Sequence, residues 1–301
     1  MICVFAVAGM LAAGCGVTPG GGTPGSGTSP AVSASLLEQL SLERINRARL
    51  HPAAEAAANG IAIDEGIPGQ LNTTPKQPLA TNAILKQTAL EHSQDMINRD
   101  YFAHNTPEGL TPFDRMTNAG YAFLAAGENI AWRGTTGAID EVNTVEAQHR
   151  DLFVDAGIPD RGHRVTMLDD TFREVGIGIV HGSFTDSGTT YDSMMQTQDF
   201  GLSTTDSTFV LGVVYHDTNS NGQYDYNEGV ADSTVTLNGV SKTTNTAGGY
   251  SFEVLSAGTY TLQFASGASQ TINIVVGSPN IKVDLVDDTN VVVNLGLGPL
   301  P

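Results

Sequence analysis

Apolar positions along this chain follow a helical spacing first and a strand-like spacing later. From Ser35 onward, apolar residues recur every three or four positions, which is the spacing of one buried face of an α-helix. A second stretch with this period covers about residues 80–99. The positions on the two faces are Leu36, Leu37, Leu40, Ile45, Ala48, Ile84, Leu85, Thr88, His92 and Met96. The pattern therefore predicts two amphipathic helices at the start of the folded region.

Strand signals follow these helices. Residues 174–180 and the stretch around 191–200 carry Val, Ile, Met or aromatic residues at short intervals, as strands do. Helices followed by strands within one region are typical of an α+β layered domain. We therefore predict an α+β domain over residues 36–201.

The last third of the chain has only the strand-like spacing. Short alternating runs are separated by Gly, Asn and Ser, as in a β-sandwich. These runs cover residues 209–215, 233–237, 249–254, 258–264, 271–276, 281–285 and 291–295. We predict a separate all-β domain over residues 207–297, joined to the first by a short polar segment.

The N-terminal residues have the pattern of an export signal. The apolar run at 2–13 is shorter than the roughly 20 residues that a membrane-spanning helix needs. It ends in Leu-Ala-Ala-Gly-Cys at 11–15, which resembles a bacterial lipobox with Cys15 as the lipidated residue. Residues 16–35 are rich in Gly, Pro, Ser and Thr, as flexible tethers are. We predict a signal peptide at 1–14 and a lipidated linker at 15–35; the alternative is an ordinary secretory signal.

The charge of the chain limits its binding partners, and the positions of its cysteines limit its disulfides. The formal net charge is −18, from 14 Lys and Arg against 32 Asp and Glu. Because affinity for nucleic acids depends on cations that neutralise phosphates, a nucleic-acid partner is excluded. The only two cysteines, Cys3 and Cys15, precede the folded region, so the mature protein has no disulfide framework.

Three polar clusters in the first domain contain candidate site residues. They lie at residues 101–109, 127–131 and 162–164, and they contribute His104, Glu128 and His163. Spacing alone leaves two interpretations open. In the first, the three residues have no common role, because a loop histidine is often only solvated and a glutamate after glycine is often a helix cap. In the second, they form a joint site of two imidazoles and a carboxylate.

The order of these segments resembles the CAP superfamily of cysteine-rich secretory proteins, antigen 5 and pathogenesis-related proteins, in its bacterial, disulfide-free form. The matching segments are LERINRAR (42–49), EHSQDM (91–96), YFAH (101–104), PFDRM (112–116), AGY (119–121), GENIA (127–131), GHR (162–164) and FREVGIG (172–178). The resemblance implies an α-β-α sandwich with an open cleft. It also implies a cleft set of two histidines and two glutamates.

Three members of that set are assigned by their motifs, as His104, Glu128 and His163. The second acidic residue is open, because the stretch at 145–155 lacks the usual tryptophan and no carboxylate aligns cleanly. The candidates are Glu146, Asp151 and Asp155, and His149 is an additional imidazole. Two imidazoles and a carboxylate could hold zinc with an open coordination position; the alternative is a polar cleft without a tightly held ion.

A second motif lies at the start of the all-β domain. Residues 217–228 fit the calcium-loop pattern D-x-[DN]-x-[DN]-G-x5-E at every defined position. The expected ligands are Asp217, Asn219, Asn221, Gln223 through its carbonyl, Asp225 and Glu228. The flanks are not helical, and together with the later runs this segment resembles SdrD B-like and carboxypeptidase-regulatory-like surface modules. That resemblance implies a prealbumin-like sandwich in which calcium stiffens the fold.

These patterns predict an exported CAP-domain protein on the cell envelope or outer surface. We expect it to be held to a membrane by a lipid on Cys15 and to bind a small apolar ligand, a metal or an envelope or protein partner in its His/Glu cleft. We expect binding rather than catalysis. The alternatives are a metal-dependent extracellular hydrolase, peptidase-like, that uses the same cleft, and a purely adhesive protein in which the cleft residues have no role.

Overall fold

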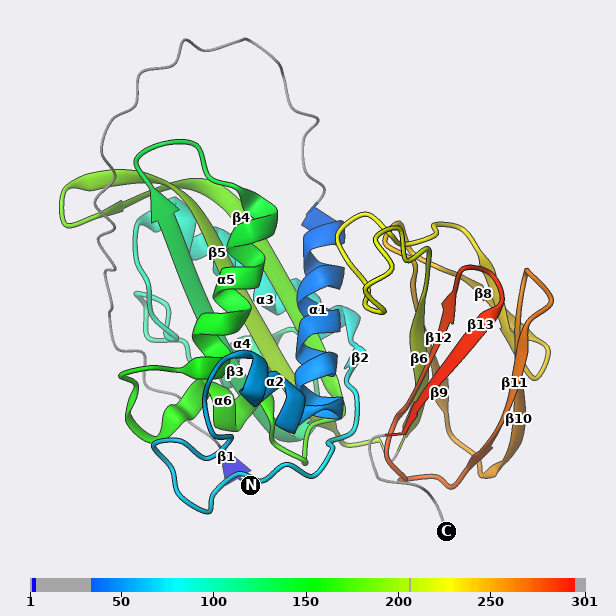
Figure 1. Ribbon diagram of the computed structural model, residues 1–301. Coiled ribbons are helices and arrows are strands. Elements are labelled where there is room, and N and C mark those ends of the chain that lie inside the picture. The colour runs from blue at the N-terminus through cyan, green and yellow to red at the C-terminus, as the bar shows by residue number, and fades with distance from the viewer. Residues whose placement is uncertain (1, 4–33, 206, 296–301) are drawn as a thin grey trace, which may run out of the picture.

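The computed structural model describes residues 2–3, 34–205 and 207–295 (Figure 1). Cys15, the linker at 16–33 and most of the predicted signal segment lie outside the described residues, so these assignments stay predictions. Among the described residues, the model has no helix with the length and apolar character needed to cross a membrane.

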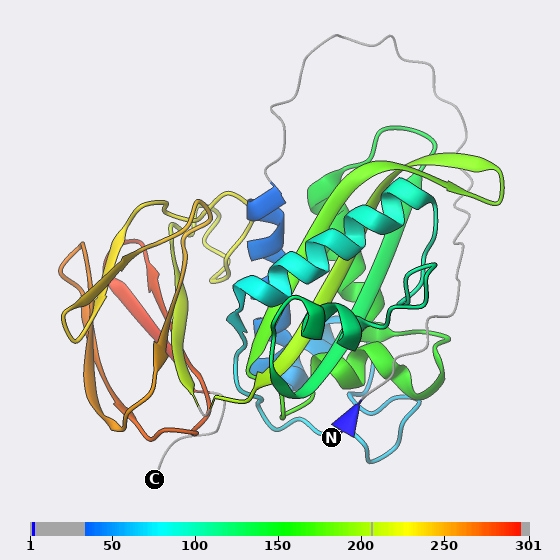
Figure 2. The ribbon, with the colours of Figure 1, turned by 180° about the vertical axis from the view of Figure 1, so that it is seen from behind.

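The first domain is a five-stranded sheet with helices on both faces. The strand order is β1-β3-β5-β4-β2. The helices α1, α2, α5 and α6 cover one face (Figure 1), and α3 crosses the other face together with α4 (Figure 2). The elements are β1 (Ile2–Cys3), α1 (Ala34–Leu50), α2 (Pro52–Ala58), β2 (Ala80–Thr81), α3 (Ala83–Arg99), α4 (Pro112–Asn118), β3 (Phe123–Thr135), α5 (Glu141–Val154), α6 (Gly162–Met167), β4 (Glu174–Asp186) and β5 (Thr189–Ser203). The predicted α-β-α sandwich is confirmed.

Two details of the predicted element order are wrong. The helix expected from about residue 80 begins at Ala83, because the side chain of Asn82 accepts the amide hydrogens of Ile84 and Leu85 and caps the helix there. Residues 80–81 instead pair with β4. The long strand β3 also precedes α5 and α6, so strands do not simply follow helices. Its centre contains Gly, Glu and Asn, which hide the strand signal in the sequence.

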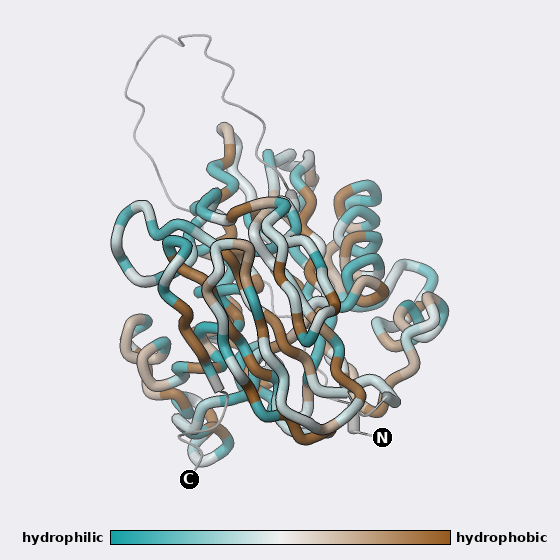
Figure 3. Tube along the Cα trace, turned by 90° about the vertical axis from the view of Figure 1, so that its right-hand side faces the viewer, coloured by the Kyte–Doolittle hydropathy of each residue, from teal (hydrophilic) through white to brown (hydrophobic). Residues whose placement is uncertain are grey.

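The second domain packs two four-stranded sheets face to face. The strand orders are β11-β10-β7-β8 and β13-β12-β6-β9. The strands are β6 (Thr208–Tyr215), β7 (Thr234–Leu237), β8 (Val240–Thr243), β9 (Gly249–Val254), β10 (Gly258–Phe264), β11 (Ser269–Ile274), β12 (Ile281–Val286) and β13 (Asn290–Leu295). Hydrophobic and hydrophilic residues alternate along these strands (Figure 3). The alternation buries one side of each sheet, and the predicted β-sandwich is confirmed.

One apolar core runs across both domains. It joins Leu37, Leu40 and Ile45 of α1 to Tyr215 and Val286 of the sandwich. The two domains are therefore packed together through α1, which lies between the first sheet and the sandwich in Figure 1.

Helix α3 contacts the backbone of β4 directly, because glycines face it. A Cβ atom at Gly178 would lie 2.2 Å from the backbone nitrogen of Leu90, and one at Gly176 would lie 2.0 Å from the backbone of Leu85. The hydroxyl of Ser93 donates to the Gly178 carbonyl at 2.9 Å. Side chains at these two glycines would therefore push the helix away from the sheet.

We predict that Gly178→Ala lowers the free energy of unfolding by about 2–3 kcal/mol, because the added methyl group overpacks a backbone contact that cannot relax locally. Urea unfolding of both proteins measures the change. Gly137→Ala is the matched control, since the nearest atom to its Cβ would be a side-chain oxygen at 3.9 Å. Equal losses in the two variants would contradict the assignment.

His181 links β4 to two neighbouring elements by its two ring nitrogens. Nδ1 lies 2.7 Å from Glu141 at the start of α5, and Nε2 lies 2.5 Å from Asp192 of β5. Partial burial alone would lower the pKa of His181, but the hydrogen bonds and charges of Asp192 and Glu141 outweigh it and raise the pKa above its usual value. The imidazolium form donates to both carboxylates, and the neutral form cannot.

We predict that this contact stabilises the fold fully below the unfolded pKa of histidine, about 6.5, and is lost as pH rises through the higher folded value. The group is half exposed, so we expect a change below about 1 kcal/mol. Urea unfolding from pH 5.5 to pH 8.5 measures it, and His181→Gln should flatten the curve. His51→Gln is the control, because His51 makes no capping hydrogen bond with its side chain. An unchanged slope in His181→Gln would sink this assignment.

Candidate functional site

The first predicted site residue, His104, is held by Glu128. His104 lies in the loop between α3 and α4, and its Nδ1 is 2.7 Å from an oxygen of Glu128 on β3. Arg115 of α4 forms an ion pair with the other oxygen of Glu128. The same arginine donates to the His104 carbonyl at 2.7 Å. Arg115 therefore fixes both partners of the pair.

The protonation state of this pair follows from its partners. Burial alone would raise the pKa of Glu128, but the hydrogen bond from His104 and the charge of Arg115 outweigh it and lower the pKa. An ionised carboxylate only accepts hydrogen bonds, so the Nδ1 atom of His104 carries the proton. The Nε2 atom of a neutral His104 is then an acceptor. It is buried and has no hydrogen-bond partner within the described residues.

The second predicted histidine, His163, is held by Asp155 in the same way. Asp155 ends α5 in the left-handed conformation, with φ of 55°. Its carboxylate accepts the backbone amide of His163 at 2.8 Å and lies 2.7 Å from His163 Nδ1. The Nε2 atom of His163 is again buried without a partner in the described part of the chain. The structure thus contains two histidines, each oriented through Nδ1 by a carboxylate.

The sequence left three candidates for the second acidic residue of the site, and in the structure each of the three carboxylates has a different partner. Only Asp155 contacts His163. Glu146 instead pairs with Arg44 of α1 at 2.6 Å. Asp151 pairs with Arg133 at 2.7 Å, where both side chains are about half exposed.

The additional imidazole, His149, lies away from these pairs. Its Nε2 is 2.9 Å from Glu55 of α2, and both side chains are buried. His149 therefore belongs to the packing of α5 against α2.

The two histidine pairs lie on opposite sides of β3. Glu128 contacts His104, while the side chain of the next residue, Asn129, donates to the carbonyl of His163 at 3.1 Å. Successive side chains of a strand point to opposite faces of the sheet. Among the residues that the structure describes, no group of three His, Cys, Asp or Glu side chains is arranged to hold a metal ion. Zinc in the cleft stays a prediction, and the residues present do not fit a centre with three protein ligands.

Sequence reasoning missed two residues of the first pair's surroundings. Arg115 stands in the PFDRM segment, but nothing local indicates its ion pair with Glu128. Asp199 lies directly opposite Glu128 in the pairing of β3 with β5. It is fully buried, and it accepts the Thr88 hydroxyl at 2.6 Å. Burial raises the pKa of Asp199 well above its usual value, and the charge of Glu128 adds to the rise.

The predicted calcium loop folds back on its own side chains. Asp217 accepts the backbone amides of Asn221 at 3.0 Å and of Gly222 at 2.8 Å. At the other end, Glu228 accepts the amide and hydroxyl of Thr218 and the amide of Asp225. The oxygens at the first and last positions of the motif therefore both point into the loop.

The middle of the loop supplies the remaining oxygens. The side-chain amides of Asn219 and Asn221 both donate to Asp225 at 2.7 Å. Gly222 has φ of 75° with open space around its missing Cβ, so glycine is needed there for the backbone and not for packing. Asp217, Asp225 and Glu228 supply carboxylates and the asparagines supply amide oxygens, and hard oxygen ligands of this kind suit calcium. For Gln223 the motif uses the backbone carbonyl, and its side chain accepts a hydrogen bond from Arg47 at 2.8 Å.

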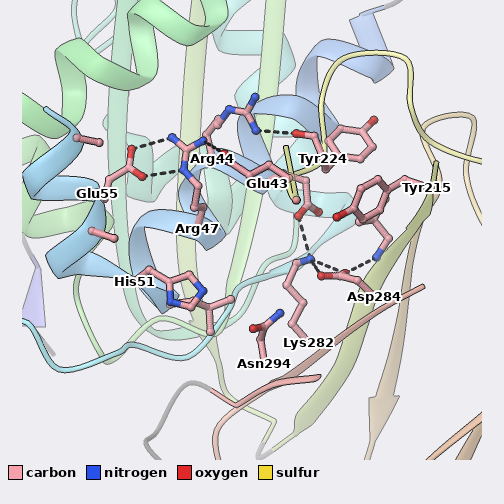
Figure 4. A pocket seen from close by; sticks show the side chains of 16 residues that line it. Glu43, Arg44, Arg47, His51, Glu55, Tyr215, Tyr224, Lys282, Asp284 and Asn294 are labelled. Carbon is pink, nitrogen blue, oxygen red and sulfur yellow. Dashed lines mark hydrogen bonds and ion pairs between the residues drawn. The ribbon is translucent and has the colours of Figure 1, made fainter. Parts of the chain in front are cut away.

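A cavity of about 450 Å³ lies between the two domains beside this loop. Figure 4 shows Lys282 between Glu43 and Asp284 on one side and the pair of Arg47 with Glu55 on the other. Lys282 is buried and lies 2.9 Å from Glu43 and 2.5 Å from Asp284. Burial alone would lower the pKa of Lys282, but the two carboxylates outweigh it and raise the pKa.

Comparison with known proteins supports both predicted resemblances. The sequence model of the cysteine-rich secretory protein family (CAP) matches residues 42–200, and that of the SdrD B-like domain matches residues 210–294. The uncharacterized protein YkwD of Bacillus subtilis (strain 168) is 35% identical over 104 residues, which are 35% of this chain and 35% of YkwD.

Two solved structures are similar in part. An extracellular protein containing a SCP domain from Bacillus anthracis str. Ames is 26% identical, with a TM-score of 0.30, over 42% of this chain and 34% of that one. An outer surface protein from Borrelia burgdorferi is 15% identical, with a TM-score of 0.29, over 42% of this chain and 77% of that one. The chain spans about a third of the length of YkwD and of the Bacillus anthracis protein. Because the family's sequence model covers more than half of its length, this chain belongs to the cysteine-rich secretory protein (CAP) family.

Proposed function

We propose that this chain is an exported binding protein, held to the cell envelope by a lipid on Cys15, with a calcium-stabilised sandwich as its second domain. The CAP domain binds ligands at its two oriented histidines, each of which is a separate binding position because the two pairs lie on opposite sides of β3. Export and lipidation rest on the N-terminal sequence pattern.

One observation carries the binding role. His104 and His163 each have Nδ1 held by a carboxylate and a buried Nε2 without a partner in the described residues. A buried polar atom left unpaired costs about 1–3 kcal/mol. A ligand that offers a hydroxyl or N–H group, or a metal cation, would satisfy these acceptors. We therefore propose a small, mostly apolar ligand with such a donor group, or an envelope partner that presents one.

The geometry favours binding over hydrolysis. The metal-dependent hydrolase alternative needs an open metal position and a carboxylate that is free to act as its base. Both oxygens of Glu128 are already bonded, one to His104 and one to Arg115. Asp155 is likewise occupied by the amide and Nδ1 of His163.

We predict that both histidines carry a proton on Nδ1, because that atom donates to a carboxylate, and that Nε2 is the ring nitrogen available to a ligand. Long-range ¹H–¹⁵N spectra of the side chains measure this directly. Zinc ions, used as a probe, should shift the Nε2 signals of both residues in the wild-type protein. Asp155→Asn should weaken zinc binding at His163 about 10–100-fold, because the carboxylate orients the ring and increases its basicity.

Asp151→Asn is the matched control, since Asp151 lies on α5 but pairs with exposed Arg133. It should leave both histidines unchanged. Nε2 signals that zinc does not move in the wild type would refute the proposed binding role.

Calcium in the loop at 217–228 is the second part of the proposal. The complete sequence motif supports it, as do the bonds by which Asp217 and Glu228 close the loop, although, among the described residues, its three carboxylates are not grouped as metal ligands without the ion. We predict that calcium raises the free energy of unfolding by about 2.7 kcal/mol at a hundredfold excess over its dissociation constant, because it binds only the folded loop. Calorimetric melting with calcium and with chelator measures the gain.

Glu228→Gln should abolish the gain, because the motif places a bidentate carboxylate at this position. Asp232→Asn is the control, because Asp232 is an exposed aspartate just outside the loop. Identical melting in calcium and in chelator would remove the calcium site from the proposal.

A further inference from the structure

The calcium loop is in contact with the CAP domain through one buried arginine. Arg44 of α1 is 5% exposed. It donates to the Tyr224 carbonyl at 2.7 Å and to Asp225 at 2.7 Å. Its remaining donors bond Glu146 of α5 at 2.6, 2.9 and 3.0 Å. One guanidinium therefore joins two CAP helices to the second half of the loop.

We propose that Arg44 is a positioning residue of the calcium loop and that calcium binding there is coupled to the docking of the sandwich on α1 and α5. This inference rests on the proposed calcium site. Arg44 touches no expected ligand atom except one oxygen of Asp225, whose other oxygen accepts from Asn219 and Asn221. The arginine thus acts behind the loop, as the outer partners of metal ligands do.

The shape of the arginine matters as well as its charge. A planar guanidinium bonds a carboxylate through two parallel donors and holds it in a fixed orientation. Glu146 fixes the guanidinium of Arg44 in this way. The oriented guanidinium in turn bonds the Tyr224 carbonyl and the Asp225 carboxylate, and so it holds residues 224–225 in a fixed position relative to α1.

The rest of the interface leaves the loop little freedom to move away from α1. The rings of Tyr215 and Tyr224 pack in the apolar core that includes α1. Behind them, buried Lys282 of β12 pairs with Glu43, the residue next to Arg44. A change in the loop's backbone on calcium binding must therefore also change the contacts of α1. Coupling of this kind is reciprocal, so docking raises calcium affinity by the same factor by which calcium favours docking.

The test compares calcium binding by the wild-type chain, Arg44→Lys and Arg47→Lys in titration calorimetry. Arg44→Lys keeps the positive charge near the loop but removes the planar fork. We expect its calcium affinity to be about 10–100-fold lower. Arg47 is one turn further along α1. It pairs with Glu55 and touches the loop only at the Gln223 side chain, which is not the expected ligand atom. We expect the affinity of Arg47→Lys to equal that of the wild type.

A second measurement uses the wild type alone and does not depend on how the variants fold. Hydrogen exchange with and without calcium should show added protection in residues 217–228 and also in α1 and α5. Protection confined to the loop would overturn the coupling, as would equal affinities for Arg44→Lys and the wild type, or equal losses in both lysine variants. A wild type that binds no calcium would instead refute the calcium site itself, and with it this inference.

Discussion

Helix α1 must hold charged side chains in the interior of the protein, and their pairing determines how the two domains meet. The helix is buried along most of its length, and its buried charged residues are Glu38, Glu43, Arg44 and Arg49. A buried charge without a partner destabilises a fold by several kcal/mol. Glu43 forms an ion pair with Lys282, and Arg44 forms one with Asp225. Both of these partners belong to the sandwich. Arg49 donates instead to backbone carbonyls of the CAP domain, among them those of Gln77 and Met167. The sandwich thus supplies part of the charge pairing of the buried helix α1.

The CAP domain repeats a single arrangement in two places. A carboxylate holds one ring nitrogen of each histidine, and the other nitrogen is left as a buried acceptor. The carboxylates come from different local structures, since Glu128 is in the middle of a strand and Asp155 ends a helix. Both are in turn held by further donors, the Arg115 guanidinium for Glu128 and the His163 amide for Asp155. This support keeps the rings oriented without a ligand, so less ordering is needed when a ligand binds.

The sequence was sufficient for the two fold classes. It also singled out His104, Glu128, His163 and the loop at 217–228 by local motifs, and their binding roles stay predictions. The sequence was insufficient where a residue's role depends on how distant segments fold against each other. Asp155 meets His163 only because it adopts a left-handed conformation after α5, and spacing could not separate it from Glu146 and Asp151. Asp199 and Arg115 were missed because strand pairing and loop packing bring them to Glu128 from distant positions. The contact of Arg44 with Asp225 joins residues 181 positions apart, and no local pattern records it.

The apolar core shared by α1 and the sandwich also constrains how this protein can evolve. Only a short segment connects β5, which ends at Ser203, to β6, which begins at Thr208. Recombination within that segment would join the CAP domain to another module without changing either sequence. The new chain would nevertheless leave Glu43 without Lys282 and Arg44 without Asp225. The two domains are therefore expected to be inherited as one unit, with substitutions on α1 matched by changes on β12 and in the loop.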